Sequence, residues 1–251
     1  MPDLPAIAAA TLIVMRDVPT GPPEIAMVER AQAMAFAGGA LVFPGGRVDT
    51  ADRTLAQRFG GDADDIAARI AAIRETIEEA GIAIGLSRPL DAPAIRALGS
   101  DVYGGVAIGD ALDSRGVSID PAALTPFARW LPKGVAHRIF DTSFYIARAP
   151  VDAPQARVDG GENVRLIWAS AQAILDDADA GRCEIIFPTR RNLERLARFA
   201  NVDAALVDAA ACPVTTVTPW IEERGGDRFL CIPEGLGYPI TAERLDAVRR
   251  A

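Results

Sequence analysis

The stretch V-F-P-G-G-R-V-D at residues 42–49 is followed further along the chain by R-E-T-I-E-E-A-G-I at residues 74–82. Between them, G-G-D-A-D-D at residues 60–65 predicts the start of a helix, because small turn residues precede acids that the helix dipole favours. Isoleucines then recur at steps of four, three and four, the spacing of one buried helix face: Ile66, Ile70, Ile73 and Ile77. Gly81 predicts the end of this helix, since glycine takes the left-handed conformation without steric cost.

Three glutamates lie on the side of this helix that faces away from the isoleucines. At about 100° per residue, Glu75, Glu78 and Glu79 share an arc of roughly 100°. Arg74 lies four residues before Glu78 and can reach it. Like charges at this spacing repel one another unless a cation lies among them, and Mg²⁺ takes carboxylate, water and phosphate oxygens as ligands. A solvated acidic face is the alternative interpretation, and the Pro-Gly-Gly segment upstream favours the metal.

The two motifs together resemble the Nudix box, G-x5-E-x7-R-E-U-x-E-E-x-G-U, in which U is a bulky aliphatic residue. Gly46 matches the first glycine, and residues 74–82 match the second half. Three departures stand out. Asp52 replaces the first glutamate, Thr76 replaces the first aliphatic residue, and 21 residues instead of seven separate Asp52 from Arg74, which is an insertion of 14.

One Nudix subgroup, which includes a peroxisomal coenzyme A diphosphatase, has a long insertion at this point. In this feature the chain resembles that subgroup. Three later stretches also resemble that subgroup: R-I-F-D-T-S-F-Y-I-A at 138–147, L-I-W-A-S at 166–170 and F-P-T-R-R-N-L at 187–193. The resemblance implies an α/β fold, a Nudix-type α/β/α sandwich with a mixed sheet and helical insertions. The residue pattern alone supports only mixed α and β structure.

We expect residues 1–251 to form a single Nudix domain with the box at 46–82. The insertion, at about 53–66, is expected to be a surface excursion that leaves the glycine turn and the helix in contact. Residues of about 86–126 are expected to form helices that cap one side of the sheet. C-terminal helices and a hairpin are expected at about 189–240.

The resemblance implies metal-dependent hydrolysis of a diphosphate linkage. Mg²⁺ or Mn²⁺ would be bound by four residues: Gly46, Glu75, Glu78 and Glu79. Arg74 would orient the carboxylates, most plausibly Glu78. The general base stays open between Glu75, Glu79 and Glu162. Glu162, which follows two glycines before an expected strand, is equally well explained as a charged turn residue.

Coenzyme A is the substrate that the resemblance favours, and ADP-ribose or NADH is the alternative. Coenzyme A-hydrolysing Nudix proteins carry a segment that ends in G-x3-F-P-G-G, which residues 39–46 match, but Ala35 stands where that segment has an arginine. The cations for the substrate phosphates would have to come from elsewhere, and the candidates are Arg30, Arg47, Lys133 and Arg138. Solvated loop charges are the alternative for the last two.

The composition limits the classes of partner. A net charge of −8 argues against a nucleic-acid surface but is compatible with a small phosphorylated substrate, because a bound metal supplies local positive charge. No apolar run approaches the roughly 18 residues of a membrane span, and residues 1–7 lack secretory signal features, so a cytoplasmic protein without membrane contact is expected. A homodimer is possible. The rival hypotheses are a degenerate Nudix domain that binds a ligand or partner, and an unrelated acidic helix.

Overall fold

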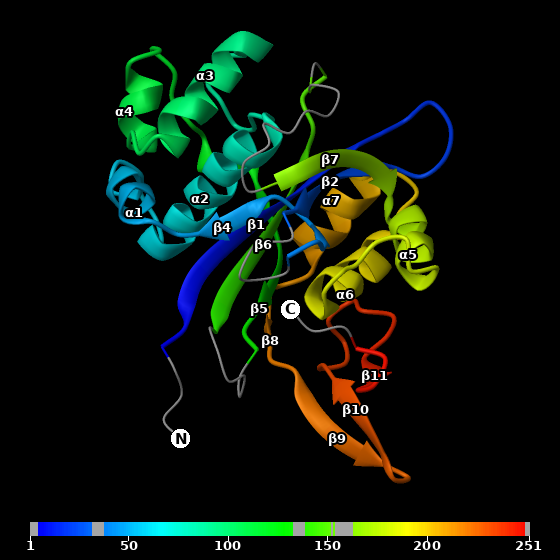
Figure 1. The fold of residues 1–251 in the computed structure, drawn as a ribbon. Helices are drawn as coiled ribbons and strands as arrows, with labels where there is room; N and C mark the ends of the chain where they lie inside the picture. Colours follow the sequence, from blue (N-terminus) through cyan, green and yellow to red (C-terminus); the bar gives the residue numbers. More distant parts are fainter. Residues whose placement is uncertain (1–4, 32–37, 133–138, 152, 154–162, 249–251) are drawn as a thin grey trace.

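The protein is built around a mixed sheet of eight strands (Figure 1). The computed structural model describes residues 5–31, 38–132, 139–151, 153 and 163–248. The strands of this sheet are β1 (Ile7–Arg16), β2 (Glu24–Arg30), β3 (Leu41–Val42), β4 (Gly45–Arg47), β5 (Thr125–Trp130), β6 (Phe140–Arg148), β7 (Asn163–Ser170) and β8 (Thr216–Val217). Their order is β3-β2-β1-β6-β5-β8, with β7 paired to β2 and β4 paired to β1. β1 runs parallel to β6 and antiparallel to β2, so the sheet is mixed.

The central strands are buried on both faces. In β1, Leu12 and Val14 belong to one hydrophobic cluster, whereas Ile13 and Met15 belong to the other. Side chains of a strand alternate between the two faces of its sheet, so a continuous apolar run is what a strand covered on both faces requires. The apolar run in β1 therefore indicates that this strand lies between the two hydrophobic clusters.

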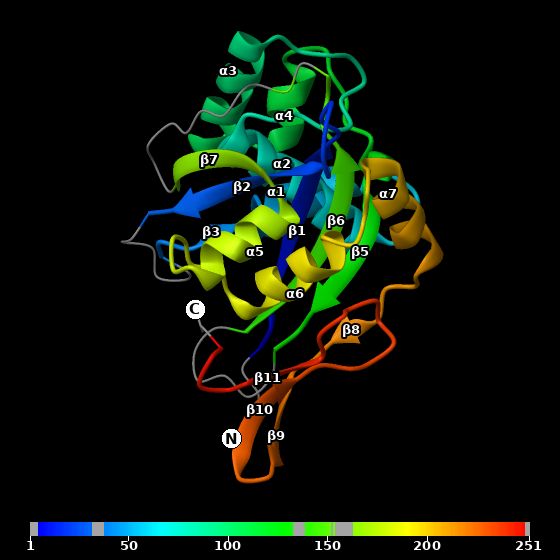
Figure 2. The same cartoon turned by 90° about the vertical axis from the view of Figure 1, so that its right-hand side faces the viewer.

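Helices cover both faces of the sheet, which confirms the predicted α/β/α arrangement (Figures 1 and 2). One face carries α2 (Ala63–Ala80), with α1 (Thr50–Ala56), α3 (Ala92–Tyr103) and α4 (Ile108–Asp113) on the same side. The other face carries α5 (Ala171–Asp179), α6 (Phe187–Leu196) and α7 (Val202–Ala211). A separate three-stranded sheet follows, made of β9 (Trp220–Arg224), β10 (Asp227–Cys231) and β11 (Ala242–Arg244).

The predicted glutamate-bearing helix is α2, and its ends lie where the sequence places them. Asp62 caps its N-terminus by accepting hydrogen bonds from the amides of Asp64 and Asp65. Gly81 ends it with φ of 64°, in the left-handed region. All four isoleucines of the predicted apolar face are buried. Alanines on the other sides of α2 are buried as well, because α1 and α3 pack against it.

β1 exchanges partners along its length. Its first half pairs with β4, through Ala9–Arg47, Ala10–Gly46 and Thr11–Gly45. Its last two residues pair with β2, where Met15 lies opposite Ile25 and Arg16 lies opposite Glu24. The short strand β4 thus fills the place that β2 leaves, directly beneath α2, and this arrangement brings the glycines of the first motif to the helix of the second (Figure 1).

Three expectations about this part of the chain need correction. Gly45 and Gly46 belong to a strand, not to the tight turn that the Pro-Gly-Gly segment predicts. The insertion is not only a surface excursion, since it forms most of α1 and buries Leu55 and Ala56 in the core. The helices α3 and α4 pack on α2 and α1 instead of directly on the sheet.

The structure has helices α3 and α4 within residues 86–126, and it has α6, α7 and the β9–β10 hairpin between residues 187 and 231. Among the described helices, none combines the length and apolar character that spanning a bilayer requires. The division of the chain into one domain stays a prediction.

The central position of α2 makes its isoleucines costly to truncate. We expect Ile70→Ala, at a side chain that is 0% exposed, to lower the free energy of unfolding by about 2–5 kcal/mol, because a cavity is left in a packed core. Val207→Ala, at a side chain that is 69% exposed, is the matched control and should change it by less than about 0.5 kcal/mol. Urea unfolding of both variants measures the difference. Equal effects would contradict the placement of α2 at the centre of the core.

Candidate active site

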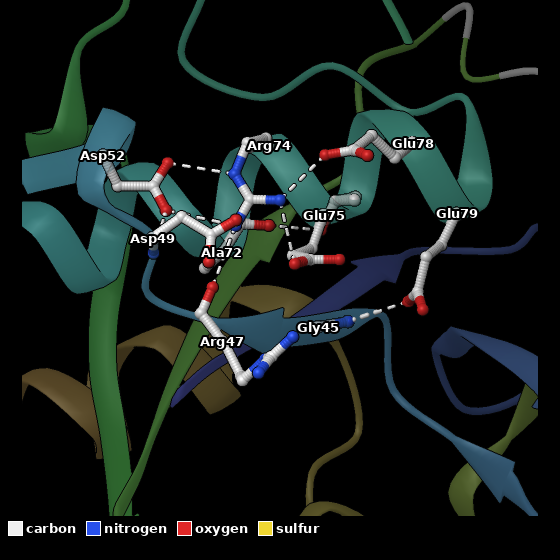
Figure 3. Close-up of polar contacts among 10 residues, drawn as sticks. Gly45, Arg47, Asp49, Asp52, Ala72, Arg74, Glu75, Glu78 and Glu79 are labelled. Carbon is white, nitrogen blue, oxygen red and sulfur yellow. Dashed lines mark hydrogen bonds and ion pairs between the residues drawn. The ribbon is translucent and has the colours of Figure 1, made fainter. Parts of the chain in front are cut away.

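A buried arginine on α2 is the centre of the polar cluster (Figure 3). Arg74 is 6% exposed and donates five hydrogen bonds, which is the number of N–H groups a guanidinium carries. Nη1 donates to Glu75 at 2.9 Å and to Glu78 at 2.8 Å, and Nη2 donates to the carbonyl oxygen of Arg47 at 2.9 Å. The contact with Glu78 that the four-residue spacing predicts is therefore present.

Asp52 provides the other two acceptors of Arg74. Nε donates to its Oδ1 at 3.0 Å and Nη2 donates to its Oδ2 at 3.1 Å, so the pair is bidentate. The Asp52 side chain is 0% exposed, and Oδ2 also accepts the Asp49 amide at 2.8 Å, at the start of α1. Asp52, whose side chain is shorter than the glutamate of the family pattern, thus takes part in the cluster.

The cluster carries more negative than positive charge. Burial alone would lower the pKa of Arg74, but its hydrogen bonds to Asp52 and the charge of Glu75 raise it above its ordinary value. Burial raises the pKa of Glu75 to about 8 against the opposing charge of Arg74, and the nearby carboxylates add to the rise. The pKa of Glu78 is also raised, mainly by burial. One guanidinium therefore only partly compensates these carboxylates.

Glu79 is held from the strand side. Its Oε2 accepts a hydrogen bond from the amide of Gly45 at 2.9 Å, as Figure 3 shows. A Cβ added at Gly46 would overlap the Glu75 carboxylate, and one added at Gly45 would lie 2.5 Å from the carbonyl oxygen of Ala10. Neither glycine has a positive φ, so the space they leave, not their conformational freedom, is what the site uses. The glycine motif and the helix meet as predicted.

The other predicted site residues are spread over the chain. Arg47 is exposed and lies on β4 beside the two glycines, with its carbonyl bound to Arg74. Arg30 ends β2 and is half-buried, opposite Asn163 of β7. Lys133, Arg138 and Glu162 lie outside the described residues, so the roles expected of them stay predictions.

The donor set fits a hard divalent cation by type and by charge. Carboxylate oxygens are the ligands that Mg²⁺ prefers, and four carboxylates with one guanidinium leave three negative charges in excess when all are ionised. Among the described residues, no three acidic, histidine or cysteine side chains converge on one point. Glu75 and Glu78 turn toward Arg74 while Glu79 turns toward Gly45, so the side chains would have to rotate to share one ion.

Three contributions to this site are absent from the sequence-based prediction. These are the Asp52 carboxylate, the Gly45 amide and the Arg47 carbonyl as partners of the α2 side chains. The signal for the first was available, because Asp49-x-x-Asp52 has the spacing of a capping box at a helix start. The two backbone contacts follow from the pairing of β4 with β1, which a local pattern does not reveal.

Comparison with known proteins supports placing the chain in the Nudix hydrolase superfamily. No family model matches the chain. A crystal structure of a NUDIX hydrolase from Alicyclobacillus acidocaldarius is 28% identical and superposes with a TM-score of 0.71, over 81% of this chain and 96% of that one. The Caenorhabditis elegans protein named "Putative nudix hydrolase 7" is 26% identical over 182 residues. That alignment covers 71% of this chain and 57% of the length of the relative.

The close approach of β4 to β1 gives a test of the glycine strand. We expect Gly45→Ala to destabilise the fold by about 1–3 kcal/mol, because its Cβ would press on the backbone of Ala10 and Thr11. Gly60→Ala is the control, since Gly60 is exposed and a Cβ there meets no atom within 4 Å. Thermal or urea unfolding distinguishes them, and a Gly45→Ala protein as stable as the wild type would refute the strand geometry.

Proposed function

We propose that this protein is a metal-dependent Nudix diphosphatase that hydrolyses a compound of the form nucleoside diphosphate-X, with a coenzyme A-type substrate favoured. The observation that carries the proposal is the clustering of three glutamates on α2 beside the glycine strand. Arg74 holds Glu75 and Glu78, while the Gly45 amide holds Glu79 on the same helix. The likeness to the Alicyclobacillus acidocaldarius hydrolase, which extends over most of both chains, supports the same class of reaction.

The acids on α2 would hold Mg²⁺ or Mn²⁺, with the carbonyl of Gly46 as a further candidate ligand. When bound, such an ion supplies positive charge for the phosphoryl oxygens and lowers the pKa of water, so that hydroxide can attack phosphorus. Arg74 keeps the carboxylates in place by sharing its donors between them. The general base stays open between Glu75, Glu79 and Glu162.

The substrate would bind with its phosphates toward the exposed cation of β4. Arg47 follows the two glycines directly and is exposed, so its side chain is available to an anionic ligand beside the glutamates. Arg30, Lys133 and Arg138 remain the other candidates. The proposal of coenzyme A rests on the G-x3-F-P-G-G ending at residues 39–46, and ADP-ribose or NADH is the alternative substrate.

A degenerate domain that only binds a ligand or partner is the second candidate function. Its main support was the aspartate at position 52. Because Asp52 accepts two hydrogen bonds from Arg74, this departure from the family pattern does not disrupt the cluster. The hydrolase is therefore the better supported hypothesis.

We expect activity to require a divalent metal and Glu79→Gln to abolish it without unfolding the protein. A glutamine keeps an oxygen that can accept the Gly45 amide, but it removes the negative charge that attracts the cation. We expect kcat to fall at least about 100-fold. Loss of a metal ligand should cost more than loss of a residue that only orients a ligand, which costs about 10–100-fold. Phosphate-release assays on a diphosphate substrate at several Mg²⁺ and Mn²⁺ concentrations measure it.

The control for this experiment is Glu223→Gln, the same substitution at an exposed position of β9. It should leave kcat and the metal requirement unchanged, and both variants should show the circular dichroism spectrum of the wild type. If Glu79→Gln turned over substrate at a near-normal rate at limiting metal, the assignment of Glu79 as a ligand would be wrong.

The choice of substrate is tested by comparing two diphosphates. Coenzyme A should be cleaved to 3′,5′-ADP and phosphopantetheine with a clearly higher kcat/KM than ADP-ribose, with one water added across the P–O–P linkage. Chromatography of the products gives both rates and the position of cleavage. An equal or reversed preference would refute the coenzyme A assignment and leave the hydrolase proposal standing.

A further inference from the structure

A second cavity of the protein lies away from the glutamates of α2. Helices α5 and α6 cover the opposite face of the sheet, with β11 beside α6 (Figure 2). These three elements and the residues that follow β11 enclose a cavity of about 260 Å³. We propose that this cavity is a ligand site that takes a small organic ammonium compound. The site is separate from the proposed hydrolase site and does not depend on it.

Three charged side chains line the cavity, and each comes from a different element. Asp179 ends α5, Arg190 belongs to the first turn of α6, and Glu243 lies on β11. Nη2 of Arg190 donates to Asp179 at 2.6 Å, so the positive charge of this arginine is compensated. An anionic ligand therefore gains little here, although the arginine lies at a helix N-terminus.

A buried ion-pair cluster adjoins this lining. Arg191 is 2% exposed, and its Nη2 donates to Glu243 at 2.8 Å and lies 2.9 Å from Oε1 of Glu194. The Glu194 side chain is 9% exposed, and within the described part of the chain no donor reaches its Oε2. Glu194 follows Arg190 by four residues, so both lie on the same face of α6. One guanidinium nitrogen thus serves two carboxylates, and one of these lacks a further partner.

The charges of this region do not balance. Three carboxylates face two guanidinium groups, which leaves one negative charge in excess when all five are ionised: Asp179, Glu194 and Glu243 against Arg190 and Arg191. A buried charge without a partner is unfavourable. An ammonium group at Glu243 would supply the missing positive charge and would allow Arg191 to pair fully with Glu194.

The remaining lining favours an organic cation over a metal ion. Ile185, Phe187 and Val248 offer apolar surface to an alkyl chain. An aromatic ring attracts cations, and the guanidinium carbon of Arg191 already lies 5.1 Å from the centroid of Phe187. In the described ranges no three acidic, histidine or cysteine side chains converge on one point, as a site for a bare metal ion would require. The volume is below the roughly 300 Å³ at which pockets for drug-sized ligands begin, so the ligand is small.

Proton binding to Glu194 competes with the cation. Burial raises the pKa of Glu194 to about 7, the charges of Arg191 and Arg190 oppose the rise, and those of Glu243 and Asp179 add to it. Below this pKa the carboxyl group is neutral and the excess charge is gone, whereas an alkylammonium group keeps its charge up to a pH of about 10. Affinity for the cation should therefore rise about tenfold between pH values of about 6 and about 8.

The experiment uses butylamine as the probe, with 1-butanol and butyrate as the neutral and anionic controls. Each compound is titrated into the isotope-labelled protein at both pH values, and amide chemical shifts in NMR spectra give the binding site and the Kd. Glu194→Gln removes the buried charge, and Ala178→Leu fills the cavity from α5. Glu223→Gln is the matched control, because it changes the net charge equally at an exposed position.

We expect butylamine to cause saturable shifts in α5, α6 and residues 242–248, in the wild type and in Glu223→Gln alike. In both proteins the Kd should be about tenfold lower at the higher pH. Glu194→Gln should bind at the higher pH as weakly as the wild type does at the lower pH. Ala178→Leu should lose binding, and if this variant does not fold, the comparison of Glu194→Gln with the wild type decides the question.

Four results would overturn the inference. Butylamine without saturable shifts would mean that the cavity takes only water. Equal affinity for 1-butanol would mean that apolar contact alone drives binding, and tighter binding of butyrate would mark an anion site. Unchanged affinity in a folded Ala178→Leu or in Glu194→Gln would place the binding elsewhere on this acidic protein.

Discussion

A buried guanidinium has no neutral form at ordinary pH, and this constraint shapes the centre of the molecule. Arg74 must keep its charge and satisfy five donors at a place that water barely reaches. The structure meets this demand with acceptors from three separate segments, namely the end of β4, the start of α1 and α2 itself. These segments can meet only if β4 lies against β1 and α2 crosses above it, so the polar cluster and the sheet arrangement depend on each other.

Local patterns were sufficient for individual elements of the fold, whereas the α/β/α arrangement was expected only from the family resemblance. The period of the isoleucines, the cap at Asp62 and the stop at Gly81 all depend on residues close in the chain, and the structure has each of them. What these patterns could not reveal is which strand pairs with the glycines of the first motif, because pairing joins residues far apart in sequence.

The glycine segment illustrates that limit. Pro44-Gly45-Gly46 has the composition of a tight turn, yet Gly45 and Gly46 pair with Thr11 and Ala10 of β1. The glycines are needed because another backbone and a carboxylate approach them closely, and this crowding depends on tertiary structure. Asp52 was misjudged for a similar reason. Compared with the family pattern its side chain is short, but at the start of α1 its carboxylate lies within hydrogen-bond distance of Arg74, and only the structure shows this contact.

Glu78 and Glu79 are held in the site by chemically different partners, which divide it into an Arg74 half and a Glu79 half. Glu78 depends on the guanidinium of Arg74, whose own place depends on the carboxylate of Asp52, and a single nucleotide change can remove either group. Glu79 is held by the amide of Gly45, and only a proline would delete a main-chain N–H. Over evolutionary time, the Arg74 half can drift only through coordinated changes on α1 and α2, whereas the Glu79 half is constrained by space, because any side chain at Gly45 would press on the backbone of β1.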